Sequence, residues 1–187
     1  MDPLLALVER LDAEDPATGA HGRAVASWCT RIADAMRLAR DEREWIARSA
    51  HLHDVGKLRV SKELLRAPRA LLASERAAVA LHVVEGERIL AEYGLLVYRD
   101  AVLHHHERYD GRGYPDGLTG AAIPLAARIV AVADAYDAMT GQRPYRFPMT
   151  PDRALLEIER SRGSQFDPDV VEVMLAVAGR ALRPVAV

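Results

Sequence analysis

Several features that would point to other classes of protein are missing from this chain of 187 residues. The single cysteine, Cys29, excludes an intramolecular disulfide and agrees with a reducing compartment. No apolar run approaches the roughly 18 residues that cross a membrane, and the N-terminus has no basic segment followed by a long apolar stretch. The net charge of -2 gives no overall basic field for nucleic acid. We therefore expect a cytoplasmic protein that binds neither DNA nor a membrane.

Helical patterns dominate the sequence, whereas the alternation typical of strands is nearly absent. A capping side chain precedes a proline suited to the first helical turn at Asp15-Pro16, Thr150-Pro151 and Asp167-Pro168. Asp41, followed by Glu44, resembles a capping box. The patterns predict helices within residues 3–12, 15–40, 42–55, 74–93, 97–107, 124–140, 150–161 and 168–182. Residues 1–187 are therefore expected to form one compact all-α domain of seven or more helices.

Residues 110–120 interrupt this helical pattern. The segment reads Asp-Gly-Arg-Gly-Tyr-Pro-Asp-Gly-Leu-Thr-Gly and holds four of the twelve glycines, which excludes a stable helix. An ordered loop of this length inside a compact domain is more often functional than decorative. A plain surface connection would have the same composition, so both interpretations stay open.

Some histidines and aspartates fall where their side chains should face the interior. His21 and His82 each share a helical face with apolar residues. Asp134 lies in a segment that is apolar on most sides, where an uncompensated carboxylate is costly to bury. Each has a structural explanation when taken singly: a hydrogen-bonded core histidine, or for Asp134 an ion pair with Arg128 or Arg143.

Two adjacent pairs, His53-Asp54 and His105-His106, add further candidates. After the first pair, we expect Gly56 to end the helix, so that neighbouring side chains converge. Imidazoles and carboxylates together suit iron, manganese or zinc. Seven such ligands exceed what one ion needs and fit two ions that share a bridging carboxylate. Their joint occurrence over five predicted helices therefore predicts two divalent ions, with Fe or Mn as first candidates and Zn as the third.

Several segments also occur in an order and spacing that are characteristic of a known family. They are Thr18-Gly-Ala-His21, His53-Asp-Val-Gly-Lys57, His82-Val-Val-Glu-Gly86, His105-His-Glu-Arg-Tyr-Asp-Gly-Arg-Gly-Tyr-Pro115, Ala127-Arg-Ile-Val-Ala-Val-Ala-Asp134-Ala-Tyr-Asp137-Ala-Met-Thr140, Arg143-Pro-Tyr-Arg146 and Gln165-Phe-Asp-Pro168. Running from about residue 15 to 170, they resemble the HD-GYP family of the HD phosphohydrolase superfamily. The His-Asp pair alone indicates only the superfamily, whereas the Gly-Tyr-Pro loop indicates this branch.

This resemblance implies a cyclic di-GMP phosphodiesterase that forms pGpG, and in many members GMP, by attack of a metal-bridging hydroxide. The metal ligands that it implies are His21, His53, Asp54, His82, His105, His106 and Asp134. Asp54 would bridge the ions, and Lys57 would contact the scissile phosphate, which makes these two the catalytic residues. The substrate-binding positions that it implies are Gly113, Tyr114, Arg143 and Arg146; the last is commonly lysine in the family.

Other positions refine this expectation. Some members carry a glutamate four residues before the first histidine that helps to bind a third metal, whereas this chain has Ala17, so two ions are expected. Glu107 and Asp110 are expected to orient the ligands, and His51 and His104 are assigned no role.

Two alternatives stay open. One is a catalytically weak signalling module that binds a GGDEF-domain partner. The other is an HD phosphohydrolase that acts on a different nucleotide. A second copy of this chain is a further candidate partner.

Overall fold

The computed structural model describes residues 2–141 and 147–179, and in these ranges the chain is helical without a named strand. The prediction of an all-α fold is confirmed. The α-helices are α1 (Pro3–Glu14), α2 (Pro16–Ala35), α3 (Arg40–Leu52), α4 (Lys62–Leu65), α5 (Ala73–Ala80), α6 (His82–Glu92), α7 (Arg99–His104), α8 (Leu125–Thr140), α9 (Pro151–Arg160) and α10 (Pro168–Val177). Short 3-10 helices are η1 (Val55–Arg59), η2 (Leu96–Tyr98) and η3 (Gly120–Ala122). No helix among these is long and apolar enough to cross a membrane.

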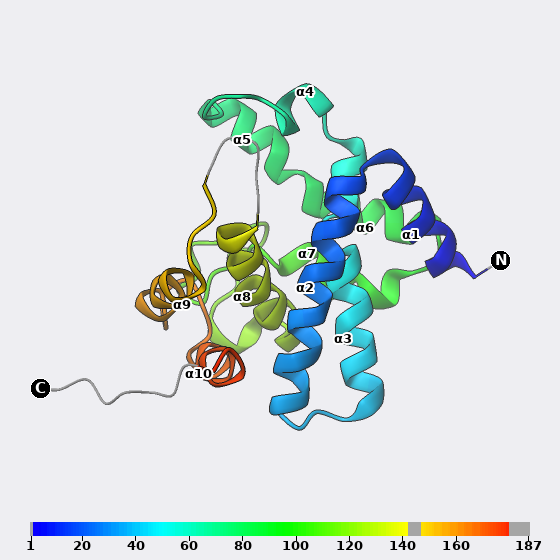
Figure 1. The fold of residues 1–187 in the computed structure, drawn as a ribbon. Coiled ribbons are helices and arrows are strands. Elements are labelled where there is room, and N and C mark those ends of the chain that lie inside the picture. Colours follow the sequence, from blue (N-terminus) through cyan, green and yellow to red (C-terminus); the bar gives the residue numbers. More distant parts are fainter. Residues whose placement is uncertain (1, 142–146, 180–187) are drawn as a thin grey trace, which may run out of the picture.

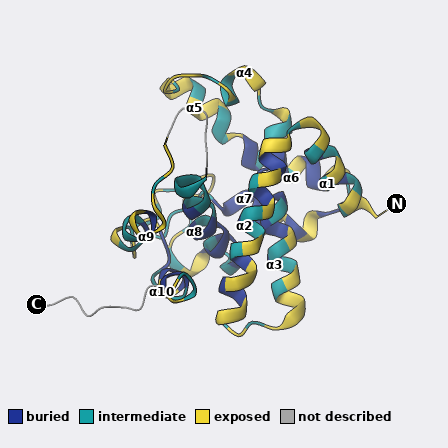
Figure 2. Ribbon diagram, viewed as in Figure 1, coloured by how far each residue is buried: buried dark blue, intermediate teal, exposed yellow. Residues whose placement is uncertain are grey.

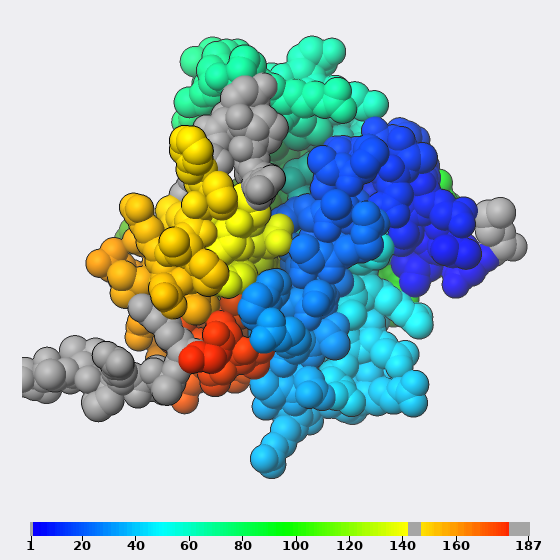
Figure 3. Space-filling model, viewed as in Figure 1, coloured from blue at the N-terminus to red at the C-terminus, as the bar shows by residue number. Residues whose placement is uncertain are grey.

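Helices α2 and α3 lie side by side through the middle of the molecule, with α8, α9 and α10 on one flank and α1 and α6 on the other (Figure 1). Helices α4 and α5 lie at one end, far from α10, and show mostly exposed residues (Figures 2 and 3). This arrangement leaves α7 in the interior, in contact with α3, α6 and α8.

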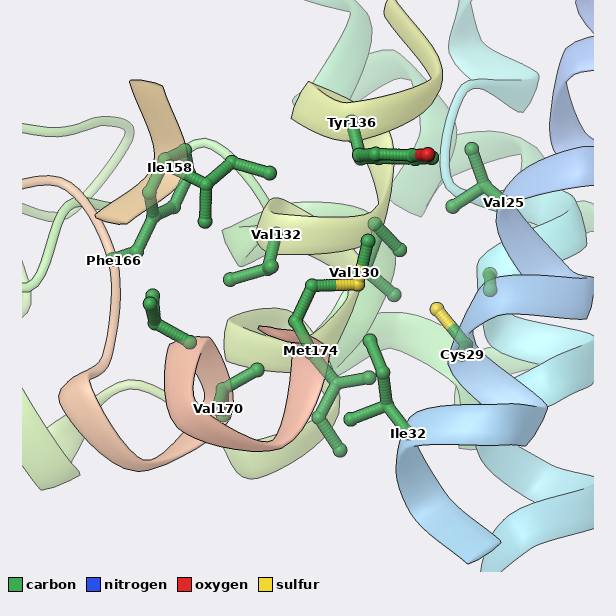
Figure 4. Packing of buried hydrophobic residues seen from close by; sticks show 14 of the residues in the cluster. Val25, Cys29, Ile32, Val130, Val132, Tyr136, Ile158, Phe166, Val170 and Met174 are labelled. Carbon is green, nitrogen blue, oxygen red and sulfur yellow. The ribbon is translucent and has the colours of Figure 1, made fainter. Parts of the chain in front are cut away.

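The buried apolar residues form two clusters. The larger one packs α2, α8 and α10 against one another, where Cys29 and Ile32 lie near Val130 and Met174 (Figure 4). The smaller one joins α1, η1 and α6. Ala50 belongs to the first cluster and Leu52 to the second. The end of α3 is therefore held from both sides.

The three predicted Asp-Pro and Thr-Pro helix starts are confirmed. Asp15 accepts a hydrogen bond from the Thr18 backbone, Thr150 from Arg153, and Asp167 from Asp169 and Val170. The predicted Asp41–Glu44 capping box is wrong. Helix α3 already begins at Arg40, so Asp41 lies inside the first turn, and the Glu44 carboxylate accepts from the Arg40 side chain.

The helix predicted over 74–93 is divided at Leu81. The Leu81 N–H bonds to the Ala78 carbonyl in a tight three-residue turn, and α6 begins at the next residue, His82. The helix predicted over 97–107 is also shorter, because α7 ends at His104. Both differences place predicted metal ligands at helix ends rather than inside helices.

Candidate metal centre

Helix ends supply most of the predicted ligand residues. His53 and Asp54 directly follow α3, His82 opens α6, and His105 and His106 directly follow α7. Within a helix, neighbouring side chains point about 100° apart, so an adjacent pair converges on one site more readily where the helix stops. His21 in α2 and Asp134 in α8 reach the same place from inside their helices.

The carboxylate of Asp54 lies at the centre of this group, and its two oxygens face different histidines. Oδ2 lies 3.3 Å from His53 Nε2 and 3.8 Å from His21 Nε2. Oδ1 lies 3.3 Å from His82 Nε2 and 4.0 Å from His105 Nε2. A single buried carboxylate therefore separates two groups of imidazole nitrogens.

Each group is compact enough to surround one cation. His21, His53 and Asp54 offer ligand atoms that all lie within 4.8 Å of one another, and the same holds for His82, His105 and His106. Asp134 joins the first group, since its Oδ1 lies 2.9 Å from His21 Nε2 and 4.0 Å from His53 Nε2. The structure thus brings together all seven residues predicted as ligands.

Backbone carbonyls fix the orientation of three imidazoles. His53 Nδ1 bonds to the Ala50 carbonyl at 2.7 Å, and His105 Nδ1 bonds to the Val102 carbonyl at 2.9 Å. His82 makes the same contact with the residue three positions before it, at 2.8 Å. A carbonyl can only accept, so Nδ1 carries the proton and Nε2 presents its lone pair to the site. This is the tautomer that a metal ligand needs.

His53 supplies a test of whether these residues fit a cation. Its side chain is fully buried, and its Nε2 has no hydrogen-bond partner among the described residues. Such an unpaired buried nitrogen normally costs free energy. A cation bound between His53 and Asp54 would satisfy that nitrogen, so the donor set fits a metal.

The pKa shifts favour ligands in their metal-binding forms. Burial lowers the pKa of His82, and it lowers that of His105 well below the ordinary value with a further contribution from the neighbouring His106. Burial and His82 bring the pKa of His106 to about 4. Burial alone would raise the pKa of Asp54, but the Lys57 ammonium and the neighbouring His53 hold it well below its usual range. At neutral pH these imidazoles are therefore neutral, and the carboxylate is ionised.

His21 differs from the other histidines because both of its nitrogens face carboxylates. Nε2 lies 2.9 Å from Asp134 Oδ1, and Nδ1 lies 2.6 Å from Asp137 Oδ2. Burial lowers the pKa of His21, but the hydrogen bonds to Asp134 and Asp137 outweigh it and raise the pKa to about 9. The sequence-based site omitted Asp137, although its position three residues after Asp134 places both on one helical face. Asp137 orients His21 as the carbonyls orient the other rings.

The raised pKa of His21 predicts that the metal-free protein releases a proton when it binds cations. His21 is protonated below pH 9 and must lose its proton to offer Nε2, whereas His82, His105 and His106 are already neutral. We expect release of roughly one proton per chain at pH 7.5, falling toward zero above pH 9. Titration calorimetry with Mn²⁺ in buffers of different ionisation enthalpy measures it.

The matched variant for this measurement is Asp137→Asn, which removes one of the charges that raise the pKa of His21. It should release fewer protons than the unmodified chain. Equal release from both proteins would contradict the assignment of the proton to His21.

Lys57 reaches the same carboxylate from η1. Its Nζ lies 2.5 Å from Asp54 Oδ2, and its side chain is one-quarter exposed. The ammonium therefore borders the group formed by His21 and His53 and is itself partly exposed to solvent. An anion that approached this group would meet Lys57.

The segment after His106 folds back over it. The ring of Tyr114 stacks on the His106 ring with a centroid distance of 5.0 Å, and the Tyr114 N–H bonds to the His106 carbonyl at 3.3 Å. Burial raises the pKa of Tyr114 to about 12, with contributions from Asp54 and Asp134, so its hydroxyl keeps its proton. Gly113 packs closely here, because a Cβ would lie 2.3 Å from the Arg108 nitrogen.

Other sequence-based expectations have different outcomes. Glu107 binds the backbone of the loop and Asp110 pairs with Arg108, so the hydrogen bonds shown for these two carboxylates do not orient metal ligands. Arg128 pairs with Asp167 rather than with Asp134. The predicted substrate contacts Arg143 and Arg146 lie outside the described residues.

Comparison with known proteins identifies the family. A family model described as an HD domain matches residues 6–170. The chain belongs to the HD domain family. It is 37% identical over 187 residues to the cyclic di-GMP phosphodiesterase response regulator RpfG of Xanthomonas campestris, covering 96% of this chain and 48% of that protein. It is also 37% identical over 172 residues to 3'3'-cGAMP-specific phosphodiesterase 2 of Vibrio cholerae, covering 90% of this chain and 33% of the relative.

Among solved structures, the HDG"Y"P protein Bd1817 of Bdellovibrio bacteriovorus has a similar fold, with a TM-score of 0.71 at 17% identity. The match covers 88% of this chain and 53% of that one. The resemblance to HD-GYP phosphodiesterases is therefore confirmed. This HD domain chain spans a third to a half of the length of the two curated relatives described.

Proposed function

We propose that this chain is a metal-dependent phosphodiesterase that hydrolyses cyclic di-GMP to pGpG. The observation that carries the proposal is the buried carboxylate of Asp54, whose two oxygens face separate groups of histidine Nε2 atoms. Such an arrangement suits two divalent cations that share one bridging ligand, as in two-metal phosphoesterases. Fe and Mn are the first candidates for the metals and Zn is the third.

The distances divide the ligands into two sets of four. One ion would be held by His21, His53, Asp54 and Asp134, and the other by Asp54, His82, His105 and His106. When bound, the cations would neutralise the phosphodiester and lower the pKa of a coordinated water. Hydrolysis adds that water's oxygen to phosphorus and breaks the bond from phosphorus to the 3' oxygen, which takes up a proton.

Residues of the chain account for binding and orientation. Lys57 would bind a non-bridging phosphate oxygen, since its ammonium borders the first ligand set. Tyr114, which stacks on His106 at the second set, would contact a base or the ribose. Gly113, Arg143 and Arg146 remain predicted nucleotide contacts; both arginines could clamp phosphate or stack on guanine.

The comparisons also suggest a second candidate substrate. One relative is named for cyclic di-GMP and another for 3'3'-cGAMP, and both are 37% identical to this chain. The two nucleotides share the phosphodiester ring and differ in one base. The metal site would act on the phosphodiester ring, which both nucleotides share. The preference for one nucleotide over the other must therefore come from residues that contact the bases.

The decisive experiment counts metals and follows turnover. We expect about two Fe or Mn per chain, and conversion of cyclic di-GMP to pGpG on chromatography, with 3'3'-cGAMP assayed in parallel. Faster turnover of 3'3'-cGAMP would transfer the proposal to that substrate. A chain that holds two metals and hydrolyses neither nucleotide would favour the signalling module that binds a GGDEF-domain partner.

The number of ions gives a separate prediction. Ala17 is exposed and lies one helical turn before His21 in α2. Because alanine offers no ligand, Ala17→Glu should raise the metal content from about two to about three per chain. Elemental analysis measures it, with Ala17→Gln as the control of equal size that lacks the charge. An unchanged count in the glutamate variant would argue against the two-ion limit.

A further inference from the structure

Glu107 lies directly after the His105–His106 pair, and one oxygen of its carboxylate holds the loop. The residue is only 3% exposed. Its Oε1 accepts the backbone N–H of Asp116 at 2.7 Å and that of Gly117 at 3.0 Å. Hydrogen bonds from backbone to a charged acceptor are among the stronger ones in proteins. Glu107 therefore fastens the far side of the loop to the segment that carries the histidines.

His104, on the other side of the histidine pair, holds the same part of the loop. It is buried, its Nδ1 lies 3.1 Å from the Asp100 carbonyl, and its Nε2 lies 3.0 Å from Asp116 Oδ2. The carbonyl can only accept, so Nδ1 donates to it. Residues 104 and 107 thus bracket the two ligands and both contact Asp116.

These contacts determine where Tyr114 lies. Its N–H bonds to the His106 carbonyl, and its neighbour Gly113 packs against the backbone of Glu107 and Arg108, where a Cβ would lie 2.5 Å from the Glu107 Cα and 2.3 Å from the Arg108 nitrogen. The loop is held at residue 114 on one side and at residues 116–117 on the other. Apart from the second attachment, the contacts that the structure describes for Tyr114 itself are one backbone hydrogen bond and the ring contact with His106.

We propose that Glu107 is a positioning residue, which holds residues 113–117 so that Tyr114 forms one wall of the nucleotide site. The inference rests on the proposed function. It assigns Glu107 an effect on nucleotide binding and none on the chemistry at the metals. A small diester that needs only the metals therefore serves as the comparison substrate.

The experiment compares cyclic di-GMP with bis(p-nitrophenyl) phosphate as substrates of the metal-loaded 187-residue chain. In Glu107→Ala, kcat/KM for cyclic di-GMP should fall about tenfold relative to that for the small diester, mainly through KM. Glu107→Gln keeps an oxygen for both N–H groups and should recover most of this loss. Glu9→Ala, at an exposed site in α1, is the control.

Three results would overturn the proposal. Equal losses of kcat/KM for both substrates, together with loss of metal, would mean that Glu107 supports the ligand histidines. A glutamine variant as poor as the alanine variant would mean that the negative charge, rather than the two hydrogen bonds, matters. An alanine variant with an unchanged ratio would mean that the loop needs no such attachment.

A second variant tests the proposal in case Glu107→Ala does not fold. A measurement that does not depend on turnover tests it in case the proposed function is wrong. Asp116→Ala changes a side chain that is about half exposed and should lower the same ratio about threefold, since it removes only the contact with His104. Amide hydrogen exchange at residues 113–117 should accelerate in Glu107→Ala. If the unmodified chain hydrolyses the small diester but no cyclic dinucleotide, the proposed function is wrong. Unchanged amide exchange at residues 113–117 in Glu107→Ala would refute the positioning role even in that case.

Discussion

Asp54→Ala should reduce phosphodiesterase activity by about three orders of magnitude or more and lower the metal content from about two ions to at most one. The carboxylate is nearly fully buried, and its two oxygens lie 3.3 Å from His53 and 3.3 Å from His82. No other described residue lies between both histidine groups in this way. Its removal would therefore take one proposed ligand from each of the two proposed ions at once. Initial rates with cyclic di-GMP and elemental analysis measure the two effects.

The matched control is Asp41→Ala, which removes an exposed aspartate from the first turn of α3. It should keep two ions and full activity, and circular dichroism should show both variants folded. Asp54→Asn separates charge from shape, because it keeps one oxygen but lacks the second. An Asp54→Ala protein that retained normal rates would remove the basis of the proposed site.

The sequence was sufficient to predict that several of these residues would lie together, because burial and side-chain chemistry conflict at their positions. Histidines on apolar helical faces and an aspartate in an apolar segment are costly unless something compensates them, and this cost is visible without coordinates. The structure places these residues around Asp54, as that argument requires. The capped helix starts at Asp15, Thr150 and Asp167 were predictable for a similar reason, since each depends on neighbouring residues alone.

What escaped prediction depends on contacts between distant segments. Asp137 could be placed on the same face as Asp134, but only the packing of α8 against α2 shows that it orients His21. The break at Leu81 follows no proline or glycine signal. Glu107 was expected to orient a metal ligand, whereas the loop returns to it ten residues later along the chain. Pattern analysis detects periodicity along one helix but does not determine which segments meet.

Gly56 is another residue whose role depends on contacts between distant segments. Its replacement gives the second large expected effect, a loss of stability. It does not end α3, which stops at Leu52; it lies where η1 crosses α6. A Cβ on Gly56 would lie 1.8 Å from the His82 carbonyl oxygen and 2.5 Å from the Gly86 nitrogen, both of them backbone atoms. Gly56→Ala must therefore separate η1 from α6. We expect a loss of about 3 kcal/mol or more in the free energy of unfolding, together with loss of metal from the His82 set.

The appropriate control is Gly94→Ala. It separates the steric clash of a new Cβ with neighbouring atoms from the loss of stability that replacing a glycine causes through its backbone conformation. A Cβ at Gly94 meets no atom within 4 Å, but φ is +71°, so the variant bears only backbone strain of about 1–2 kcal/mol. Denaturant unfolding compares the two, and elemental analysis distinguishes them further, since Gly94 lies in the turn after α6 and should leave both ions in place. A Gly56→Ala protein as stable as Gly94→Ala, with two ions bound, would show that the approach of η1 to α6 does not set the distance between Asp54 and His82. Loss of metal confined to Gly56→Ala would instead show that this glycine is needed because it lets the two halves of the metal centre meet.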